Sequence, residues 1–531
     1  MPRFFNTAGP SVPEDHYMID PLKRIDLAEV EALIDQKRYF VLHAPRQTGK
    51  TTTLLALMHH LNTGDAYRCL YANIEGAQTA RGDVDRGIST VCHVLARSAG
   101  LYLNDRSLET WFHQTSSTIP PDDRLNAMLG TFAKDSDKPI VLFLDEVDAL
   151  VGDTLISLLR QIRSGYNQRP VSFPQSIILC GVRDVRDYRI HTSHNEIITG
   201  GSAFNIKSES LRMGNFDEGE VRSLFLQHTE ETGQVFAPEI FPELWADTKG
   251  QPWLVNAMGY ELTWKTKKAR NREMPISLEH YMAGRERLIQ SRATHLDQLT
   301  DKLQENRVKR VIAGILSGES GKDKIPVDDL QYVEDLGLIA TRPQLAIANR
   351  IYREVIPREL TWSVQTVLTH QQPWYVTADH RLDLSKLLTA FQQFFREQSD
   401  AWLEKFDYKE AGPQLLMQAF LQRVVNGGGR VNREYGLGLR RTDLFVEWPL
   451  NEAEGFFGPV QRAVIELKIL RKGIRPTLAE GLSQTADYAD RCKADEAHLI
   501  IFNRDPAVSW DEKIWHQHLV HDGRTIDVWG A

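Results

Sequence analysis

Short apolar runs alternate with helical patterns through the first part of the chain. Runs of this length, followed by turn signals, predict buried strands at 39–44, 69–74, 140–144, 176–180 and 203–206. Apolar positions with a helical period lie between them and predict helices at 27–36, 50–64, 84–98 and 154–161. Strands that alternate with helices form a parallel sheet covered on both faces, so we expect an α/β domain at 1–215.

The pattern becomes helical after this domain and predicts a helical lid at 216–292. Two helices and two short strand-like pieces then follow in the order of a winged helix, at 308–316, 327–336, 338–340 and 344–348. We therefore expect a winged-helix domain at 293–365. The last region, 366–531, opens with helices and ends in strands, which predicts a second α/β domain: helices at 385–395 and 413–425, strands within 430–470 and at 497–503.

Length, charge and cysteine content limit the number of domains, the partners and the compartment, but they do not indicate a function. A chain of 531 residues exceeds one core and corresponds to about three domains of usual size. The net charge of -8 means that any contact with DNA or RNA requires a local basic surface. The four cysteines are far apart, which favours buried thiols and a reducing compartment. Without an apolar run of about 20 residues or a signal-peptide core, we expect a cytoplasmic protein with no membrane contact.

A phosphate-binding loop follows the first predicted strand. Residues 44–52 read Ala44, Pro45, Arg46, Gln47, Thr48, Gly49, Lys50, Thr51 and Thr52. This is the P-loop pattern with alanine in place of its first glycine. Its backbone amides and the helix N-terminus would surround the phosphates of ATP. Lys50 would reach the β- and γ-phosphates and the Thr51 hydroxyl would bind Mg²⁺. The alternative is an ordinary strand-to-helix turn.

A second motif completes the predicted ATP site. The apolar strand at 140–144 delivers Asp145 and Glu146 at its carboxyl end, where ligands bind to parallel sheets. Asp145 would hold Mg²⁺ through water, and Glu146 would orient or deprotonate the attacking water. The alternative is a buried strand that ends in a solvated acidic turn. Arg183, after the strand at 176–180, is a candidate sensor of the γ-phosphate or an ordinary surface arginine.

From its first residue to the end of the predicted winged helix, the chain resembles the AAA-like ATPases related to the archaeal-type and STAND signalling ATPases. Besides the P-loop and Asp145-Glu146, the matching features are His16-Tyr17, Pro21-Leu22-Lys23-Arg24, Gly250-Gln251-Pro252 and Asn349-Arg350-Ile351-Tyr352. The resemblance implies that the turn at Pro252 lies near the nucleotide and couples it to the following domains. It also implies a nucleotide-controlled switch more than a processive motor.

The last region contains a candidate metal-dependent site. Strand periodicity places Glu466 and Lys468 on one face, with Ile465 and Leu467 on the other. Asp443, on the preceding strand, can pair with this polar face. Two carboxylates with a backbone carbonyl form a hard oxygen site for Mg²⁺ or Mn²⁺, and Lys468 would lie beside the attacking water.

This spacing resembles the PD-(D/E)XK nuclease superfamily, over about 385–505. Gln484 and Tyr488, which share one face of a helix, resemble the Gln-x-x-x-Tyr helix of its RecB-like branch. The resemblance implies catalytic roles for Asp443, Glu466, Lys468, Gln484 and Tyr488. Glu410 and Glu434 compete as an additional upstream acid. The alternative is an edge strand with one solvated face.

The histidine pairs of the chain were expected to be structural or solvent-facing, because no carboxylate or cysteine accompanies them at zinc spacing. They are His59-His60, His191 with His194, and His516 with His518.

These signals favour an ATP-gated nuclease that binds ATP, Mg²⁺ and nucleic acid, in a chain that could form a homo-oligomer. Two hypotheses compete with it. One is a signalling or DNA-binding ATPase with a non-cleaving C-terminal domain. The other is an ATPase whose C-terminal region serves only for oligomerisation.

Overall fold

The computed structural model describes most of the chain. Its gaps are residues 1, 184–188, 192–196, 200–204, 292–300, 317–324, 361–373, 406–415, 419, 422–428, 438–439, 452–453, 471–472 and 506. Side chains at 189–191, 197–199, 207–208, 357–360, 397–405, 433–437, 440–443 and 457 are also outside the description. The contacts divide the chain into two compact units: Met1–His295 with Gln331–Thr341, and Leu296–Leu330 with Arg342–Ala531. The predicted division into four domains stays a prediction.

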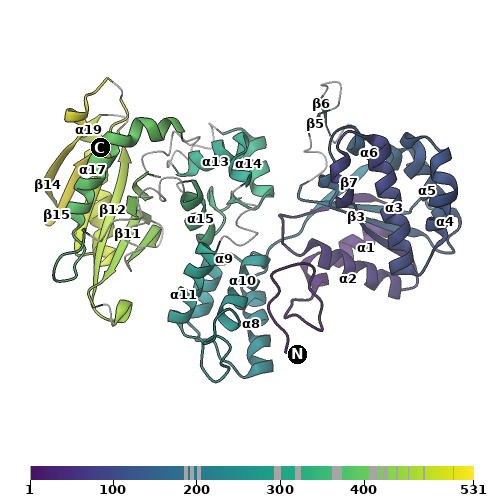
Figure 1. The fold of residues 1–531 in the computed structure, drawn as a ribbon, viewed down its shortest axis with the longest axis horizontal. Coiled ribbons are helices and arrows are strands. Elements are labelled where there is room, and N and C mark those ends of the chain that lie inside the picture. The colour runs from purple at the N-terminus through teal and green to yellow at the C-terminus, as the bar shows by residue number, and fades with distance from the viewer. Residues whose placement is uncertain are drawn as a thin grey trace. The chain divides into compact units, whose positions relative to one another are not determined.

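A parallel sheet of five strands forms the centre of the first unit (Figure 1). Its order is β2-β3-β4-β1-β7, and every described pairing is parallel. The strands are β1 (Tyr39–His43), β2 (Arg68–Asn73), β3 (Ile140–Asp145), β4 (Ser176–Gly181) and β7 (Lys207–Arg212). Four of the five predicted strands are therefore confirmed. The fifth was wrong: residues 203–204 lie outside the description, 205–206 form a turn, and the strand is β7.

Helices cover both faces of this sheet, as predicted (Figure 1). One face packs on α1 (Leu27–Asp35) and α2 (Lys50–Thr63) through Phe40, Leu42 and Phe143. The opposite face packs on α3 (Val84–Leu103), α5 (Pro121–Lys134) and α6 (Gly152–Ser164). Because successive strand residues point to opposite faces, a strand buried on both faces has to be apolar throughout. Every residue of β3 is buried. The sequence pattern did not predict α5 or the neighbouring α4 (Ser107–Thr115).

The predicted helical region consists of α8 (Glu218–Thr232), α9 (Ile240–Thr248), α10 (Pro252–Thr263) and α11 (Leu278–Gln290). The N-terminal segment packs on these helices. The Phe5 side chain is fully buried against Phe225, with ring centroids 4.9 Å apart, and the Tyr17 hydroxyl lies 3.1 Å from His228 Nδ1. The segment before the P-loop is therefore part of the core of the first unit.

The elements of the predicted winged helix are present in the predicted order. They are α13 (Asn306–Leu316), α14 (Val327–Asp335), β8 (Ile339–Ala340), β9 (Ala346–Ile347) and α15 (Arg350–Leu360). Residues Gln331–Thr341 belong to the first unit, where the arginine Nη2 of Arg212 donates to the Glu334 carbonyl at 2.9 Å. Gly337, at φ +77°, approaches Pro45 of the P-loop so closely that a Cβ there would lie 2.9 Å from the proline ring.

A mixed sheet of six strands forms the core of the second unit, in the order β10-β11-β12-β13-β15-β14. Strands β10 (Arg430–Leu437), β11 (Arg440–Pro449) and β12 (Val460–Ile469) are antiparallel neighbours. Helix α19 (Ile474–Cys492) then crosses to β13 (Glu496–Phe502), which is parallel to β12 and β15. The hairpin of β14 (Trp515–His521) and β15 (Arg524–Gly530) was not predicted.

Each face of this second sheet has a helical cover (Figure 1). Helix α17 (Leu384–Lys405) packs through Phe391 and Phe395 on the face that carries Ile465 and Leu467. Helix α19 packs on the opposite face, which carries Val464. The predicted α/β class is therefore confirmed for the second unit. The predicted helix at 413–425 lies largely outside the described residues.

Two expectations about the chain as a whole can be compared with the structure. The four cysteines are free thiols, of which Cys69, Cys92 and Cys180 are buried and Cys492 is half-buried. Among the helices that the structure describes, none combines the length and apolar character that crossing a bilayer requires.

Candidate nucleotide and metal sites

The P-loop turns sharply between β1 and α2. Gly49 caps α2 with φ +90°, a backbone conformation that side chains with a Cβ disfavour. Gln47 also has positive φ, at 56°. Ala44, the departure from the P-loop pattern, lies before the turn, and its amide donates to the Gly181 carbonyl at 3.2 Å. Alanine fits here because the residue continues the parallel pairing of β1 with β4.

Lys50 is the first residue of α2, and its side chain folds back onto the loop. Its ammonium donates to the carbonyls of Ala44 and Pro45, each at 3.0 Å, and its side chain is buried. The Thr48 hydroxyl donates to the Pro45 carbonyl at 2.7 Å. These bonds fix the loop around the cation, whereas Arg46 is exposed. A cation held among backbone amides at a helix N-terminus has the chemistry required to bind polyphosphate.

The carboxylate of Asp145 lies at the carboxyl end of β3 and is fully buried. Its Oδ2 accepts from the Thr51 hydroxyl at 2.8 Å and from the Tyr71 hydroxyl at 2.9 Å. Its Oδ1 accepts from the Glu146 amide at 2.9 Å. A hydroxyl and a carboxylate in contact beside the P-loop fit Mg²⁺, which prefers oxygen ligands. Thr51 and Asp145 would hold this ion, which would neutralise phosphate charge.

Glu146 differs from its neighbour Asp145 in surroundings. It has left-handed backbone angles, with φ 58°, and a half-buried side chain. Burial raises the pKa of this carboxyl, and the charges of Lys50 and Arg46 oppose that effect. A carboxyl with a raised pKa is suited to accept a proton from water near neutral pH.

Arg24 contributes to the loop from the other side. Its Nη1 donates to the Thr48 carbonyl at 2.8 Å, and its Nη2 donates to the Gly214 carbonyl. The guanidinium stacks on Phe216, 4.7 Å from the ring centroid. Burial lowers the pKa of Arg24 to about 10. Sequence reasoning identified Arg24 as a family feature but assigned it no role at the loop.

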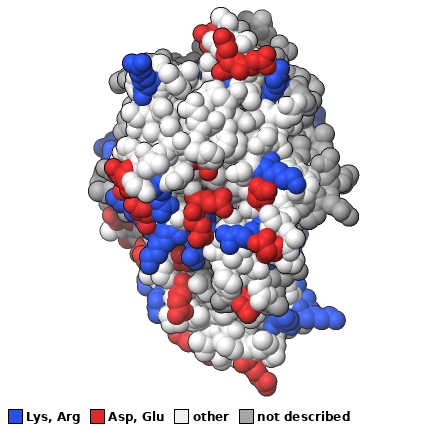
Figure 2. Space-filling model, turned by 90° about the vertical axis from the view of Figure 1, so that its left-hand side faces the viewer, with Lys and Arg blue, Asp and Glu red and all other residues white. Residues whose placement is uncertain are grey.

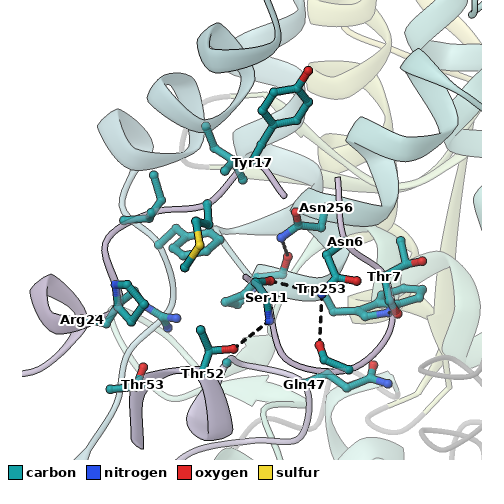
Figure 3. Close-up of a pocket in the computed structure, with 18 of the residues that line it drawn as sticks. Asn6, Thr7, Ser11, Tyr17, Arg24, Gln47, Thr52, Thr53, Trp253 and Asn256 are labelled. Atoms are coloured by element: carbon teal, nitrogen blue, oxygen red, sulfur yellow. Dashed lines mark hydrogen bonds between the residues drawn. The ribbon is translucent and has the colours of Figure 1, made fainter. Parts of the chain in front are cut away.

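A cavity of about 130 Å³ adjoins the loop (Figure 3). The N-terminal segment lines it, together with Gly49, Thr52 and the start of α10. The Ser11 amide donates to the Thr52 hydroxyl at 3.1 Å, and the Trp253 indole donates to the Thr7 carbonyl at 3.0 Å. Sequence reasoning selected Tyr17 and Pro21 as family features but missed the earlier part of the segment at 6–11, because an irregular stretch carries no periodic signal.

Two further predicted residues lie near the loop. Pro252 is the first residue of α10 and lines the cavity, and the preceding Gln251 caps that helix. The side-chain Nε2 of Gln251 approaches the backbone carbonyl of Gln47 at 3.5 Å. The guanidinium of Arg183 lies 4.6 Å from the Tyr332 ring centroid. The structure therefore pairs this candidate sensor with the segment Gln331–Thr341.

Residues 34–188 match the family model described as an AAA domain. This part of the chain is an AAA-type P-loop ATPase domain. The domain binds ATP, and it supplies ATPase activity. The match covers β1 to β4 and therefore the predicted P-loop and Asp145-Glu146 motifs.

No curated protein matches the chain in sequence. Among solved structures, a Walker-type ATPase of Pyrococcus abyssi is similar, at 13% identity and a TM-score of 0.47, over 66% of this chain and 99% of that one. Cdc6p of Pyrobaculum aerophilum has 15% identity and a TM-score of 0.34, over 64% and 93%. The RuvB Holliday junction branch migration motor of Thermotoga maritima has 12% identity and a TM-score of 0.32, over 63% of this chain and 93% of that one. Similarity at this level does not bear on substrate or mechanism.

Outside the AAA domain, the second candidate site lies on the face of the second sheet that α19 covers. Glu466 is 3% exposed, and Lys468 Nζ lies 3.1 Å from its Oε1. Lys468 Nζ also lies 4.0 Å from Oε1 of Glu480, on α19. Sequence reasoning did not select Glu480, which is four residues before Gln484 and therefore on the same helix face.

The helix residues of this site are also described. Tyr488 is buried, and Oε1 of Gln484 is a buried oxygen without a hydrogen-bond partner among the described atoms. Asp443 belongs to β11, where Leu444 pairs with Ile465, so that Asp443 and Glu466 occupy the next positions along their strands. The side chains of Asp443 and Glu434 lie outside the description, as does all of Glu410.

Proposed function

We propose that the chain is an ATP-controlled nuclease, in which the AAA-type ATPase regulates a metal-dependent phosphodiesterase in the second unit. The observation that carries the proposal is the buried Glu466 carboxylate with Lys468 beside it. A buried carboxylate is costly unless a cation or hydrogen-bond donors compensate it. Here the partner is the half-buried Lys468, whose ammonium lies 3.1 Å from Glu466 and 4.0 Å from the exposed Glu480 of α19.

These residues fit a divalent cation. Asp443 and Glu466 would bind Mg²⁺ or Mn²⁺, which would lower the pKa of a bound water and stabilise charge on the phosphate. Lys468 would hold the attacking water or a phosphate oxygen close to Glu466. Gln484, on the helix face of Glu480, has a buried oxygen that could accept a hydrogen bond, and Tyr488 packs α19 on the sheet.

Control by ATP would act through Gln331–Thr341. This segment contacts Pro45 of the P-loop through Gly337 and the candidate sensor Arg183 through Tyr332. A nucleotide that moves the loop or Arg183 would change these contacts. We infer that this segment transmits the nucleotide state.

The charge pattern limits how nucleic acid would bind. In the view of Figure 2, Lys and Arg side chains are interspersed with Asp and Glu side chains. Such a surface gives little unspecific attraction to phosphate. We therefore expect this face to contribute little to the binding of nucleic acid.

The experiment incubates the purified chain with Mg²⁺ or Mn²⁺ and linear DNA, circular DNA or RNA, with and without ATP. The variants are Asp443→Ala, Glu466→Gln and Lys50→Ala. Asp522→Asn, an exposed carboxyl of the same unit, is the matched control. We expect Asp443→Ala and Glu466→Gln to lose cleavage, Asp522→Asn to retain it, and Lys50→Ala to remove its dependence on ATP.

Cleavage that survives in Glu466→Gln would refute the site. If no substrate is cleaved while ATP hydrolysis is intact, the non-cleaving signalling or DNA-binding ATPase becomes the better hypothesis. Binding of Mn²⁺ by the unaltered chain but not by Glu466→Gln would still support the metal site.

A further inference from the structure

Two histidines and an aspartate meet on the β14–β15 hairpin. Residues His516, His518 and Asp527 each offer one ligand atom, and these atoms all lie within 4.8 Å of one another. His516 Nε2 is 2.9 Å from Asp527 Oδ1, and His518 Nδ1 contacts the same oxygen. The strand register produces this meeting, because His518 pairs directly with Asp527 across the hairpin.

The surrounding residues hold these side chains in place. The His516 ring stacks on Trp529, with centroids 3.7 Å apart and an angle of 11° between the planes. The second oxygen of Asp527 faces His498 Nδ1 at 3.9 Å from the next strand, β13. His498 is fully buried, and its Nε2 lies 3.4 Å from Oε2 of Glu496.

This arrangement has the form of a metal site with an outer layer. Behind the carboxylate of Asp527 lies the buried His498, whose Nδ1 accepts from the Trp529 indole at 3.4 Å, as polar groups lie behind the ligands of many metal sites. The His498 side chain is polar and excluded from water, yet it belongs to neither the proposed nuclease site nor the ATP site. Its position behind Asp527 is the second observation that favours a site at the hairpin.

We propose that His516, His518 and Asp527 bind a divalent transition-metal ion, with Zn²⁺ as the best match. Imidazole nitrogens with one carboxylate suit Zn²⁺ and poorly suit Mg²⁺. Ligand bonds of about 2.0–2.1 Å would set the ligand atoms about 3.3 Å apart in a tetrahedron. Small side-chain rotations reach this spacing from 2.9 Å. Water would complete the coordination, because His518 is 68% exposed.

The site is separate from the proposed nuclease centre. Trp529 and Ile465 belong to the core on the face covered by α17, and Asp527 shares the strand face of Trp529. Glu466, one residue after Ile465, lies on the opposite face. The zinc proposal therefore does not depend on the nuclease proposal, and either can fail alone.

The test strips the full chain of metal with a chelator and measures Zn²⁺ binding by equilibrium dialysis in excess Mg²⁺. The Mg²⁺ occupies the oxygen sites and so isolates the nitrogen-containing one. We expect the unaltered chain to bind one Zn²⁺. In His518→Ala and in Asp527→Asn the affinity for Zn²⁺ should fall by more than the roughly 10-fold to 100-fold that is typical when only a partner of a ligand is lost. Because His518 is exposed, its replacement leaves the core intact.

His521→Ala is the control, since His521 lies on the same strand but on its other face, beside Asp522. This variant should bind Zn²⁺ like the unaltered chain. Equal Zn²⁺ binding by the unaltered chain, His518→Ala and Asp527→Asn would overturn the proposal, as would no binding at all.

Discussion

At the scale of single residues, two adjacent carboxyls of the AAA domain have different environments. Asp145 is fully buried and accepts three hydrogen bonds from hydroxyl and amide donors. Glu146 has its pKa raised by burial. The two environments arise from successive positions at the end of β3, and they are those that a metal-binding carboxylate and a proton acceptor would require.

Replacing Glu146 with glutamine should lower kcat for ATP hydrolysis by about 10²–10⁴-fold, because the proton acceptor is lost. ATP binding should persist. In the unaltered protein, kcat/KM should fall on the acid side with a pKa above the ordinary 4.5 of glutamate. A pH profile of Glu146→Gln that retained this acidic limb would contradict the assignment.

The same pKa has a consequence for folding. A carboxyl whose pKa is raised in the folded state stabilises the fold fully below its unfolded pKa of 4.5. That contribution is lost as the pH rises through the folded pKa. At pH 7.5, Glu146→Gln should therefore unfold at a higher temperature than the unaltered chain, although it is less active.

Sequence reasoning performs well where chemistry follows the chain directly. Lys50, Thr51 and Asp145 could be predicted because a strand end and a helix start bring them together in any parallel sheet of this kind. The meeting of His518 with Asp527 could not, because it depends on the register of an unpredicted hairpin. Trp253 at the cavity depends on an irregular segment almost 250 residues away.

At the scale of elements, the turn between α9 and α10 packs on Phe216, which precedes α8. Gly250 has φ +69°, and its carbonyl accepts from the Phe216 amide at 2.9 Å. A Cβ at Gly250 would lie 1.9 Å from the Phe216 carbonyl oxygen. The turn therefore has no room for any residue other than glycine. Phe216 also stacks on Arg24, which donates to the P-loop, so a change at this turn would reach the loop.

Gly250→Ala should destabilise the first unit by roughly 3 kcal/mol or more, because backbone strain adds to the steric clash. It should also weaken ATP binding. The control is Gly233→Ala, at φ +76° with no atom near the added Cβ, which should cost only about 1 kcal/mol. Denaturant titration of both variants checks the difference, and equal losses would mean that the close approach to Phe216 is unimportant.

Elements also show why part of the fold escaped prediction. Strands β1 and β3 are continuous apolar runs, since both of their faces are buried. Every position of β14 is half-buried or exposed, and its apolar residues do not form a continuous run. Strand β7 reads Lys207 to Arg212 with several polar residues, which explains the misplaced strand at 203–206.

At the scale of the whole molecule, two compact units share one chain. Units of this kind unfold in separate transitions unless a large interface couples them. Calorimetry should therefore resolve two transitions. Mg²⁺-ATP at 100 times its Kd should stabilise the transition of the first unit by about 2.7 kcal/mol.

In Lys50→Ala this shift should disappear while both transitions remain. In the unaltered chain, ATP should move the transition of the second unit less than that of the first, and in Lys50→Ala it should move neither. If ATP moved both transitions equally, the units would be energetically coupled in the resting protein, and control of the second unit would require no intermediate segment.

The contact between Gly337 and Pro45 bears on how such chains diversify. Because Gln331–Thr341 completes the surroundings of the P-loop, the first unit does not end with α11. Exchange of the downstream region by recombination would preserve these surroundings only if the junction fell after Thr341.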